Sequence, residues 1–256
     1  MGDHPKITVA IPVYNGEKFL KTCVESILKQ TRVDFELIIS DNASTDSTAT
    51  ICKEYEKNDD RIKCLSQEKN MGGVHNFNTL LENATGDYFL FMPVDNYLSP
   101  TYLEKCSKIL DSNPDAVGCI SKIAIDSRYI DPFKNKKKIL KKFGLVFRPL
   151  NTNPLLGKYD DRIKKMLKRW EWEMFYSLYR TDELKKSALW ETWTGFDAAW
   201  ILNILKYGEI QVIDESLLHS YPFGASVQGM LYMGIRHNDS ILGKIFLPIT
   251  TIIAAF

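Results

Sequence analysis

Residues 7–46, ITVAIPVYNGEKFLKTCVESILKQTRVDFELIISDNASTD, are the stretch of sequence that decides the fold. The stretch begins with Ile7–Val13, a short apolar run rich in β-branched residues that ends at the turn formers of residues 14–16. This composition predicts a buried strand that enters a turn. Apolar residues then recur at helical spacing over residues 17–29, and residues 35–40 form a second buried strand. A strand, a helix and a strand in this order predict two parallel strands joined by a right-handed crossover.

The same alternation continues through the first half of the chain. The next expected elements are a helix to about residue 57, a weak strand at 62–65, a helix opened by residues 70–73 that runs to 83, a strand at 88–92, a helix at 100–111 and a strand at 116–125. The strands are apolar on both faces, which is typical of a sheet covered by helices on each side. The pattern therefore predicts an α/β fold with a mainly parallel sheet.

The second half is less regular. Residues 127–160 are basic and rich in turn formers, so we expect a long surface segment there. Residues 170–179 are rich in aromatic side chains, residues 196–207 form a predicted helix, and short strands are expected at 210–213 and 217–221.

Composition limits the class of protein. The chain has 256 residues, of which 45% are hydrophobic and 25% are charged, as in an ordinary globular protein. Its net charge of +1 gives no reason to expect a nucleic-acid partner. The five cysteines are an odd number, widely spaced and without a CxxC pair, which argues against a disulfide framework or a zinc site and for a reducing compartment. Pro5 and Lys6 lie where a signal peptide would begin its apolar core, so we expect the chain to start in the cytoplasm.

Two segments leave a membrane surface open as a location. Six lysines crowd into residues 134–142, a run that is ordinarily a solvated surface, but the interleaved Ile139, Leu140 and Phe143 make a membrane-surface role credible. In residues 241–256 only Lys244 is charged. Sixteen residues are too few to cross a bilayer, so this segment is a buried terminal helix, an interfacial anchor or the start of a longer span. The expected location is the cytoplasm, either free or at the cytoplasmic membrane surface.

Polar residues follow each of the first four predicted strands. Ligands of a parallel sheet bind beyond the carboxyl ends of its strands. The side chains to inspect there are those of Pro12, Tyr14 and Glu17, of residues 41–46, of residues 70–73, and of Asp95 and Asn96. The chain has no GxGxxG after the first strand and no P-loop, which argues against dinucleotide binding and ATP hydrolysis. A nucleotidyltransferase would need a glycine- and basic-rich loop directly after the first strand, and YNGE is not such a loop.

The segments IPVYNGEKFLKTCVESILKQT, FELIISDNASTDST, EKNMGGVHNFNTLLENATGDYFLFM and PVDN, in this order, resemble the inverting family 2 glycosyltransferases of the GT-A fold. The likeness is dense over residues 6–120 and thinner over 170–226. It implies one continuous domain with a nucleotide-sugar-binding half at 1–126, a smaller acceptor-binding and catalytic-base half at 127–235, and an apolar segment at 236–256. It also implies sugar transfer from a nucleoside-diphosphate donor, with a UDP-sugar favoured, to a hydroxyl of a glycan or a lipid-linked saccharide. The sequence specifies neither the sugar nor the oligomeric state.

The resemblance also assigns roles to residues of the first half. By resemblance, Pro12, Tyr14, Glu17 and Asp41 hold the base and ribose of the donor, Asn70 belongs to the same donor site, and Asp95 is the metal-binding carboxylate of a DXD-type motif. A cation such as Mg²⁺ or Mn²⁺ would neutralise the charge that develops on the leaving diphosphate.

Two residues of this motif depart from the family pattern. Val94 stands where the family usually has an acidic residue, and Asn96 stands where a second Asp is common. A metal-independent variant and a catalytically silent nucleotide-sugar-binding module therefore remain alternatives.

An inverting transfer also needs a general base that accepts the proton of the attacking hydroxyl. The family takes this base from a carboxylate near the start of a helix in the C-terminal half, and Asp197 in the segment GFDAAW has that position. A helix cap is the alternative role for Asp197, and Glu191 is the second candidate for the base.

Other conspicuous residues have simpler expected roles. Asp46 is expected to cap a helix, and His75 and His219 are expected to be structural. The four tryptophans at positions 170, 172, 190 and 193 are expected to divide between the core and a platform for sugar stacking.

Overall fold

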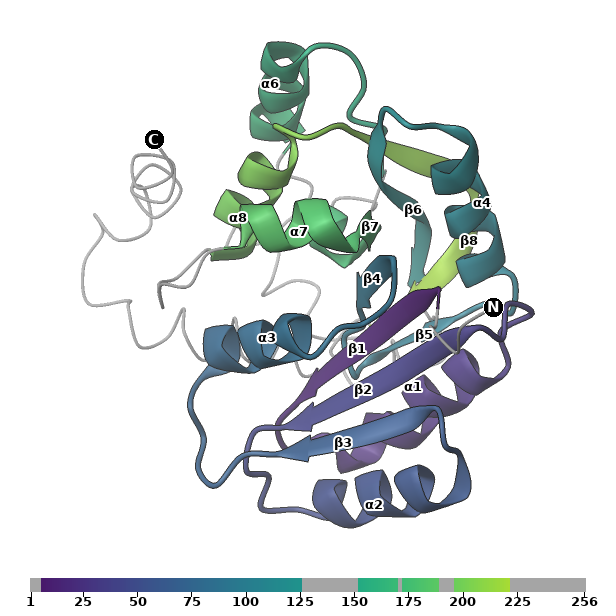
Figure 1. Ribbon diagram of the computed structural model, residues 1–256, viewed down its shortest axis with the longest axis vertical. Coiled ribbons are helices and arrows are strands. Elements are labelled where there is room, and N and C mark those ends of the chain that lie inside the picture. The colour runs from purple at the N-terminus through teal and green to yellow at the C-terminus, as the bar shows by residue number, and fades with distance from the viewer. Residues whose placement is uncertain (1–5, 126–151, 170–171, 189–195, 222–256) are drawn as a thin grey trace, which may run out of the picture.

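The computed structural model describes residues 6–125, 152–169, 172–188 and 196–221 (Figure 1). The strands are β1 (Ile7–Val13), β2 (Phe35–Asp41), β3 (Ile62–Ser66), β4 (Tyr88–Phe91), β5 (Asn96–Leu98), β6 (Ala116–Ile125), β7 (Leu178–Arg180) and β8 (Glu209–Ser220). The helices are α1 (Glu17–Leu28), α2 (Thr48–Asn58), α3 (Gly73–Glu82), α4 (Tyr102–Ser112), α6 (Tyr159–Arg169), α7 (Thr181–Ser187) and α8 (Phe196–Ile204), together with the short 3₁₀ helix η3 (Trp172–Tyr176).

The strands form one sheet in the order β3-β2-β1-β4-β7-β6-β8-β5. The first four strands of this order are parallel, β7 runs antiparallel between β4 and β6, β8 is parallel to β6, and β5 pairs antiparallel with β8. Right-handed crossovers place α1 and α2 on one face of the parallel strands and α3 on the other, as Figure 1 shows. The predicted α/β fold with a mainly parallel sheet is confirmed.

The core lies on both faces of the parallel strands. Every residue of β1 except Pro12 is buried, and β2 and β4 are almost wholly buried. Full burial of one Ile, Leu or Val side chain stabilises the fold by about 1.5–3 kcal/mol. The central strands therefore form a rigid frame, and the loops at their carboxyl ends are held in place by that frame.

The C-terminal strands differ from the prediction. The sequence predicts two short strands near residues 210–213 and 217–221, whereas β8 is one strand of 12 residues that pairs with β6 through irregular register. The exposed residues 214–216 resemble a turn in the sequence, but they form a bulge that Ser121 stabilises. Its hydroxyl oxygen accepts hydrogen bonds from the N–H groups of Leu217 and Leu218, at 3.2 and 3.0 Å.

Five elements have no counterpart in the prediction: β5, β7, α6, α7 and the short η3. β5 and β7 have three residues each, which is too short for a periodic pattern. Helix α6 lies partly in the segment that the sequence predicts to be a surface loop. No helix of the described residues is long and apolar enough to cross a bilayer.

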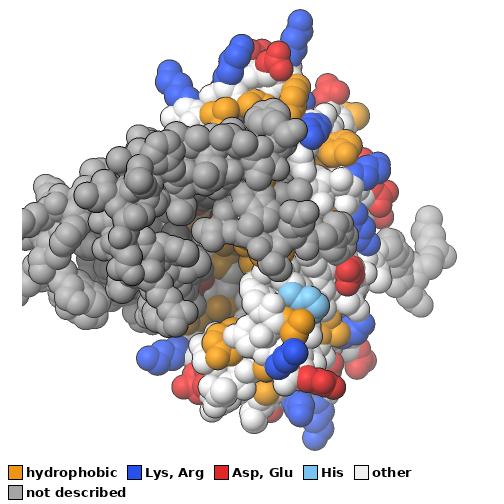
Figure 2. Space-filling model, turned by 90° about the vertical axis from the view of Figure 1, so that its left-hand side faces the viewer, with side chains coloured by type: hydrophobic (Ala, Val, Ile, Leu, Met, Phe, Trp, Pro, Cys, Tyr) orange, Lys and Arg blue, Asp and Glu red, His pale blue; other side chains and the backbone are white. Residues whose placement is uncertain are grey.

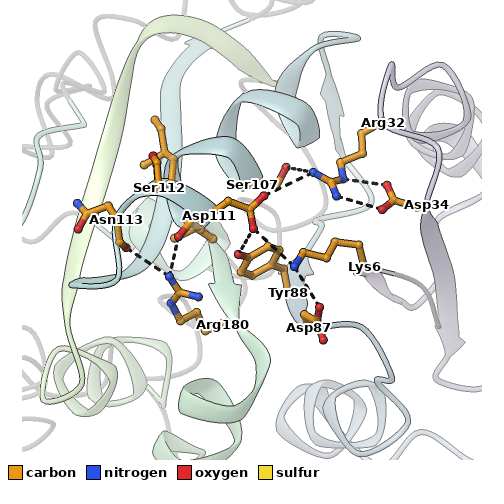
Figure 3. A network of polar contacts seen from close by, with 12 residues as sticks. Lys6, Arg32, Asp34, Asp87, Tyr88, Ser107, Asp111, Ser112, Asn113 and Arg180 are labelled. Atoms are coloured by element: carbon orange, nitrogen blue, oxygen red, sulfur yellow. Dashed lines mark hydrogen bonds and ion pairs between the residues drawn. The ribbon is translucent and has the colours of Figure 1, made fainter. Parts of the chain in front are cut away.

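A network of polar contacts joins the amino ends of the strands (Figure 3). The Lys6 ammonium lies 3.1 Å from the Asp87 carboxylate and 3.5 Å from that of Asp111, and the Tyr88 hydroxyl donates to Asp111 at 2.7 Å. Arg180 of β7 donates to the carbonyl of Leu110 at 2.7 Å. A polar hollow of about 480 Å³ beside these residues is lined by acidic and basic side chains alike. The network fastens β1, β4, β7 and α4 at the edge of the sheet that lies opposite the predicted site.

Candidate active site

The turns that follow β1 and β2 are hydrogen-bonded to each other. The N–H of Asn15 donates to the Ser44 hydroxyl at 2.8 Å, and the N–H of Thr45 donates to the Asn15 side-chain oxygen at 2.8 Å. Asn15 and Ala43 have positive φ angles of 52° and 59°. An alanine in this region costs on the order of 1 kcal/mol or more, so the interlocked turns hold a strained backbone.

Glu17 joins the same two turns through its side chain. Its carboxylate accepts the N–H of Ser47 at 3.0 Å, and its own N–H donates to the Asp46 carboxylate at 3.2 Å. Asp46 also accepts the N–H of Thr48, the first residue of α2, at 3.0 Å, although Ser47 is the N-cap residue itself. The capping role predicted for Asp46 agrees with this geometry, whereas the donor-binding role of Glu17 stays a prediction.

Asp41 ends β2 and is 4% exposed. Its Oδ1 accepts the N–H of Ser44 at 3.0 Å, while its Oδ2 makes no hydrogen bond to the described residues. Pro12, another predicted donor-binding residue, pairs in register with Ser40 just before Asp41. The carboxylate of Asp41 is therefore fixed in orientation and keeps one oxygen for a ligand.

Asn42 lies among residues 41–46, which the sequence places beyond the second strand without a role for Asn42 itself, and in the structure it organises the third loop of the site. It is 3% exposed, and its amide donates to Asn70 Oδ1 at 3.0 Å and to the carbonyl of Gly72 at 3.3 Å. Its side-chain oxygen accepts the N–H of Met71 at 2.9 Å. These bonds bring the predicted residue Asn70 to the end of β2. Only the position directly after Asp41 could have pointed to Asn42 in the sequence.

Two large apolar side chains at this edge face solvent. Tyr14 is 46% exposed and Met71 is 43% exposed. An exposed aromatic ring beside a fixed carboxylate is a suitable surface for a nucleobase, which has a flat apolar face and polar edges. Tyr14 was predicted to contact the donor, and Met71 was not.

Asp95 follows β4 and is 3% exposed, and its backbone carbonyl accepts the N–H of Tyr221 at 3.4 Å. Val94 is also buried, and its side chain packs on Gly16: a Cβ at Gly16 would lie 3.1 Å from Val94 and only 2.4 Å from Val13. The position where the family resemblance implies an acidic residue is thus an apolar part of the core, and Asp95 alone supplies a carboxylate here.

The donor set limits what kind of cation could bind. The described residues contain no group of three or more His, Cys, Asp or Glu side chains that could hold a metal ion by themselves. Mg²⁺ and Mn²⁺ take oxygen ligands, and Mg²⁺ typically keeps several waters and binds through one or two carboxylates together with substrate phosphates. Asp95 therefore fits an ion that is held mainly by the diphosphate of a bound donor.

Asp197 is the second residue of α8. Its Oδ1 accepts the N–H of Ala198 at 2.9 Å, and burial raises the pKa of its carboxyl group above the ordinary value of an aspartate. A carboxylate with a raised pKa is a better proton acceptor than one in water.

The residues that lead to Asp95 and to Asp197 pack on one ring. Phe91, four residues before Asp95, and Phe196, directly before Asp197, both contact Phe175. Burial, and after it the negative charges of Asp95, Asp197 and Glu173, raise the pKa of the neighbouring Tyr176. The sequence indicates only that the segment of Tyr176 is rich in aromatic residues.

His219 makes contacts that agree with a structural role. Its Nε2 lies 2.9 Å from the Ser99 hydroxyl, and its ring stacks on Tyr97 with centroids 4.6 Å apart and planes 5° from parallel. His75 is exposed on α3. Several predicted features lie outside the described residues or have undescribed side chains: Glu191, the tryptophans at 170, 172, 190 and 193, the lysine run at 134–142 and the segment at 241–256.

Known proteins share this sequence and architecture. The model of the family "Glycosyl transferase family 2" matches residues 8–167. The chain is 30% identical over 203 residues to glycosyltransferase GlyA of Streptococcus pneumoniae, covering 79% of this chain and 26% of GlyA. It is 29% identical over 189 residues to the uncharacterized glycosyltransferase EpsJ of Bacillus subtilis, covering 72% of this chain and 51% of EpsJ. The chain thus spans between about a quarter and a half of the length of these relatives.

Solved structures share the fold at lower identity. TarS of S. aureus, residues 1–349, superposes with a TM-score of 0.65 at 20% identity, covering 93% of this chain and 66% of the TarS chain. The mannosyltransferase PcManGT of Pyrobaculum calidifontis, in complex with GDP-Man and Mn²⁺, superposes with a TM-score of 0.61 at 14% identity, covering 89% of this chain and 60% of PcManGT. The structural likeness shows a GT-A-type fold, and the family match covers more than half of the sequence. The chain belongs to family 2 of the glycosyltransferases.

Proposed function

We propose that this protein is an inverting glycosyltransferase that moves a sugar from a nucleoside-diphosphate donor to a hydroxyl of a glycan or a lipid-linked saccharide. The observation that carries the proposal is the pair of ring contacts that joins the two halves of the chain: Phe91, four residues before Asp95, and Phe196, directly before the half-buried Asp197, both pack on Phe175. A donor site and a proton acceptor from the other half of the chain are the two parts that an inverting transfer needs.

The loops at the carboxyl ends of β1, β2 and β4 are the donor-binding part. The free Oδ2 of Asp41 accepts a hydrogen bond from the base or the ribose, the exposed Tyr14 lies against the nucleoside, and Asp95 holds the divalent cation. That cation, when bound, neutralises charge on the leaving diphosphate. A UDP-sugar is the favoured donor, because TarS has been solved with UDP and with UDP-GlcNAc and GDP-Man is bound in the more distant PcManGT.

Asp197 is the catalytic base of the proposed reaction. It takes the proton of the acceptor hydroxyl as the oxygen of that hydroxyl forms a bond to the anomeric carbon. The bond between this carbon and the diphosphate oxygen breaks on the opposite side, and its electron pair leaves with the nucleoside diphosphate. One displacement of this kind inverts the anomeric configuration.

A donor panel tests the proposal. UDP-, GDP- and dTDP-sugars are first compared by thermal shift with and without Mn²⁺, since a bound ligand raises the midpoint of unfolding. The best donor is then followed for release of the nucleoside diphosphate with and without simple sugar acceptors. Release that depends on an acceptor supports a transferase. Binding without any release, with or without metal, would instead identify a catalytically silent nucleotide-sugar-binding module.

We also propose that the protein works at an anionic membrane surface, where a lipid-linked acceptor would be met. Residues 126–169 contain 14 Lys and Arg against 4 Asp and Glu, a net charge of +10, while the rest of the chain has 19 against 28, a net charge of −9. Within the described part of this segment, Lys164, Lys165 and Lys168 of α6 are exposed, and Figure 2 shows basic side chains gathered at the α6 end of the molecule. Charge separated in this way favours an acidic surface as partner.

A further inference from the structure

Phe175 lies in the middle of five aromatic rings, which we call the aromatic cluster: Phe77, Phe91, Phe175, Phe196 and Trp200. The Phe175 ring stacks on Phe91, with centroids 5.0 Å apart and planes 7° from parallel. It meets Phe196 edge-on at 5.7 Å and 85°, and Trp200 at 5.5 Å and 63°. Phe77 meets it edge-on at 5.4 Å and 79°. Each of the other four rings therefore packs directly against Phe175.

The rings of the aromatic cluster belong to the elements that carry the proposed chemistry. Phe91 is the last residue of β4, four residues before Asp95. Phe196 is the first residue of α8 and directly precedes Asp197. Phe77 lies on α3, the helix that follows the donor loop of residues 70–73. These elements are far apart along the chain, but a ring from each of them packs against Phe175 in space.

The stacked and edge-on contacts of Phe175 define how far the neighbouring rings lie from it. Flat rings that pack face to face and edge to face fill space at fixed centroid distances, and a buried core permits little displacement. Phe175 is 3% exposed, so no solvent layer separates it from its neighbours. Phe91, which leads to Asp95, and Phe196, which leads to Asp197, thus both take their positions against the Phe175 ring, and Phe91 also meets Trp200 of α8 directly at 5.5 Å.

We propose that Phe175 is a positioning residue, whose ring sets the placement of the base Asp197 relative to the donor carboxylate Asp95. This inference rests on the proposed function. It is supported by the ring contacts of Phe175 with Phe91 and with Phe196, the residues that lead to Asp95 and to Asp197. An in-line displacement is sensitive to such placement, because a shift of about 1 Å can lower the rate by about a hundredfold.

A purely packing role is the alternative, and Phe89 provides the matched control. Phe89 is a fully buried phenylalanine on β4, and its ring packs edge-on against Phe91 at 4.5 Å. Among the described rings it touches neither α8 nor Phe175. Replacement of Phe89 by leucine removes about the same apolar area from the core as the same change at Phe175, and it removes no described ring contact with α8 or with Phe175.

The experiment compares Phe175→Leu and Phe89→Leu with the wild type. Three quantities are measured on folded protein: donor Kd by calorimetry, kcat of sugar transfer, and the rate of donor hydrolysis without acceptor. For Phe175→Leu we expect a donor Kd within about twofold of the wild type and a transfer kcat that is lowered roughly 10- to 100-fold. Hydrolysis should fall much less, because water is small and needs less exact placement. The ratio of transfer to hydrolysis therefore drops. Phe89→Leu should lower stability and leave this ratio unchanged.

Two further variants decide the remaining cases. If Phe175→Leu does not fold, Phe175→Met keeps the side-chain volume without the flat ring and takes its place. Phe196→Leu should lower the same ratio, with an effect that is not additive with that of Phe175→Leu. Equal ratios in the Phe175 and Phe89 variants would overturn the positioning role. Asp197→Asn separates the two proposals: if that variant transfers sugar at the wild-type rate, the proposed base is wrong, whatever Phe175 does.

Discussion

At the scale of single residues, the three acids of the site lie in separate parts of the fold. Asp41 accepts the N–H of Ser44, Asp197 accepts the N–H of Ala198, and Asp95 is buried just after β4. Because the three positions belong to different turns and elements, substitutions there should have separable effects. Each of these effects can be measured on its own.

Asp95→Ala should abolish transfer and leave the fold intact. Asp95 is the proposed ligand of the cation, and the turn PVDN after β4 carries no other carboxylate, so its loss would leave the proposed cation without that ligand. Turnover is measured under saturating Mg²⁺ and Mn²⁺, and far-ultraviolet circular dichroism checks the fold. Wild-type turnover in this variant would show that the metal assignment is wrong.

Asp41→Ala should raise the donor Kd more than it lowers kcat. A hydrogen bond to a charged group contributes about 1.5–3 kcal/mol, which corresponds to a loss of affinity of roughly tenfold or more. Calorimetry measures the donor Kd on folded protein. Asp59→Ala is the control, because Asp59 pairs with Arg61 at 2.7 Å and belongs to the other end of β3. Unchanged donor affinity in Asp41→Ala would refute the binding role.

Asp197→Asn should abolish transfer and, near neutral pH, raise the melting temperature. Burial raises the folded-state pKa of Asp197, so the ionised carboxylate costs stability at pH values above the unfolded-state pKa. The amide has no such cost. The gain should vanish when the pH falls below the ordinary pKa of an aspartate, where both states of the wild type are protonated. Melting curves at pH 7 and at low pH measure this difference, and equal melting temperatures at pH 7 would contradict it.

The same shift predicts the pH dependence of the wild-type enzyme. A base must be ionised to accept a proton, so transfer should fall as the pH drops through the raised pKa of Asp197. The acid limb of kcat against pH should therefore lie above the ordinary range of an aspartate. A limb within that ordinary range would assign the titrating group elsewhere.

At the scale of helices and strands, the sequence predicts the elements that have a strong local pattern. The apolar runs of β1 to β4 are bounded by turn formers, and their predicted ends agree with the structure within one residue. β5 and β7 form because they pair with strands far away in the chain, and such pairing leaves no local signal. The residues of the site also differ in whether a local pattern identifies them. Asp41 and Asp95 can be located because they lie at or just after the ends of predicted strands. Asn42 and Tyr176 acquire their roles only through contacts with distant parts of the chain, which leave no local signal.

Gly86→Ala should destabilise the pairing of β1 and β4 without affecting donor binding. A Cβ at Gly86 would lie 2.5 Å from the backbone nitrogen of Thr8 and 2.7 Å from the carbonyl carbon of Ile7, and backbone atoms cannot move aside cheaply. We expect a loss of about 1–3 kcal/mol in the free energy of unfolding, measured with urea. Gly73→Ala is the control, since no atom lies within 4 Å of the added Cβ. Equal stability of the two variants would contradict the close approach.

At the scale of the whole molecule, the separated charge predicts binding to anionic vesicles. Each lysine near acidic lipid contributes on the order of 1 kcal/mol, and residues 134–142 supply six of them. Liposome flotation of the full chain should show binding that rises with anionic lipid and falls with salt. Replacement of these lysines by glutamine, or removal of residues 241–256, should weaken it, because two weak signals act together. Protein that stays in the soluble fraction at low salt would exclude the membrane role.

The antiparallel strand β7, inserted between β4 and β6, has a consequence for synthesis on the ribosome. Until Leu178–Arg180 is made, β4 lacks its second neighbour, and β5 and β6 have no partner strand at all, because β8 is made later still. Translation at about 5–20 residues per second needs on the order of 3–10 seconds to pass from the end of β6 to β7. During that interval the nascent chain presents unpaired strand edges on β4, β5 and β6, and such edges are the features that chaperones and aggregation both exploit. Slower translation between residues 126 and 177 would lengthen this exposure, so the yield of folded protein should depend on the codons of the stretch between β6 and β7.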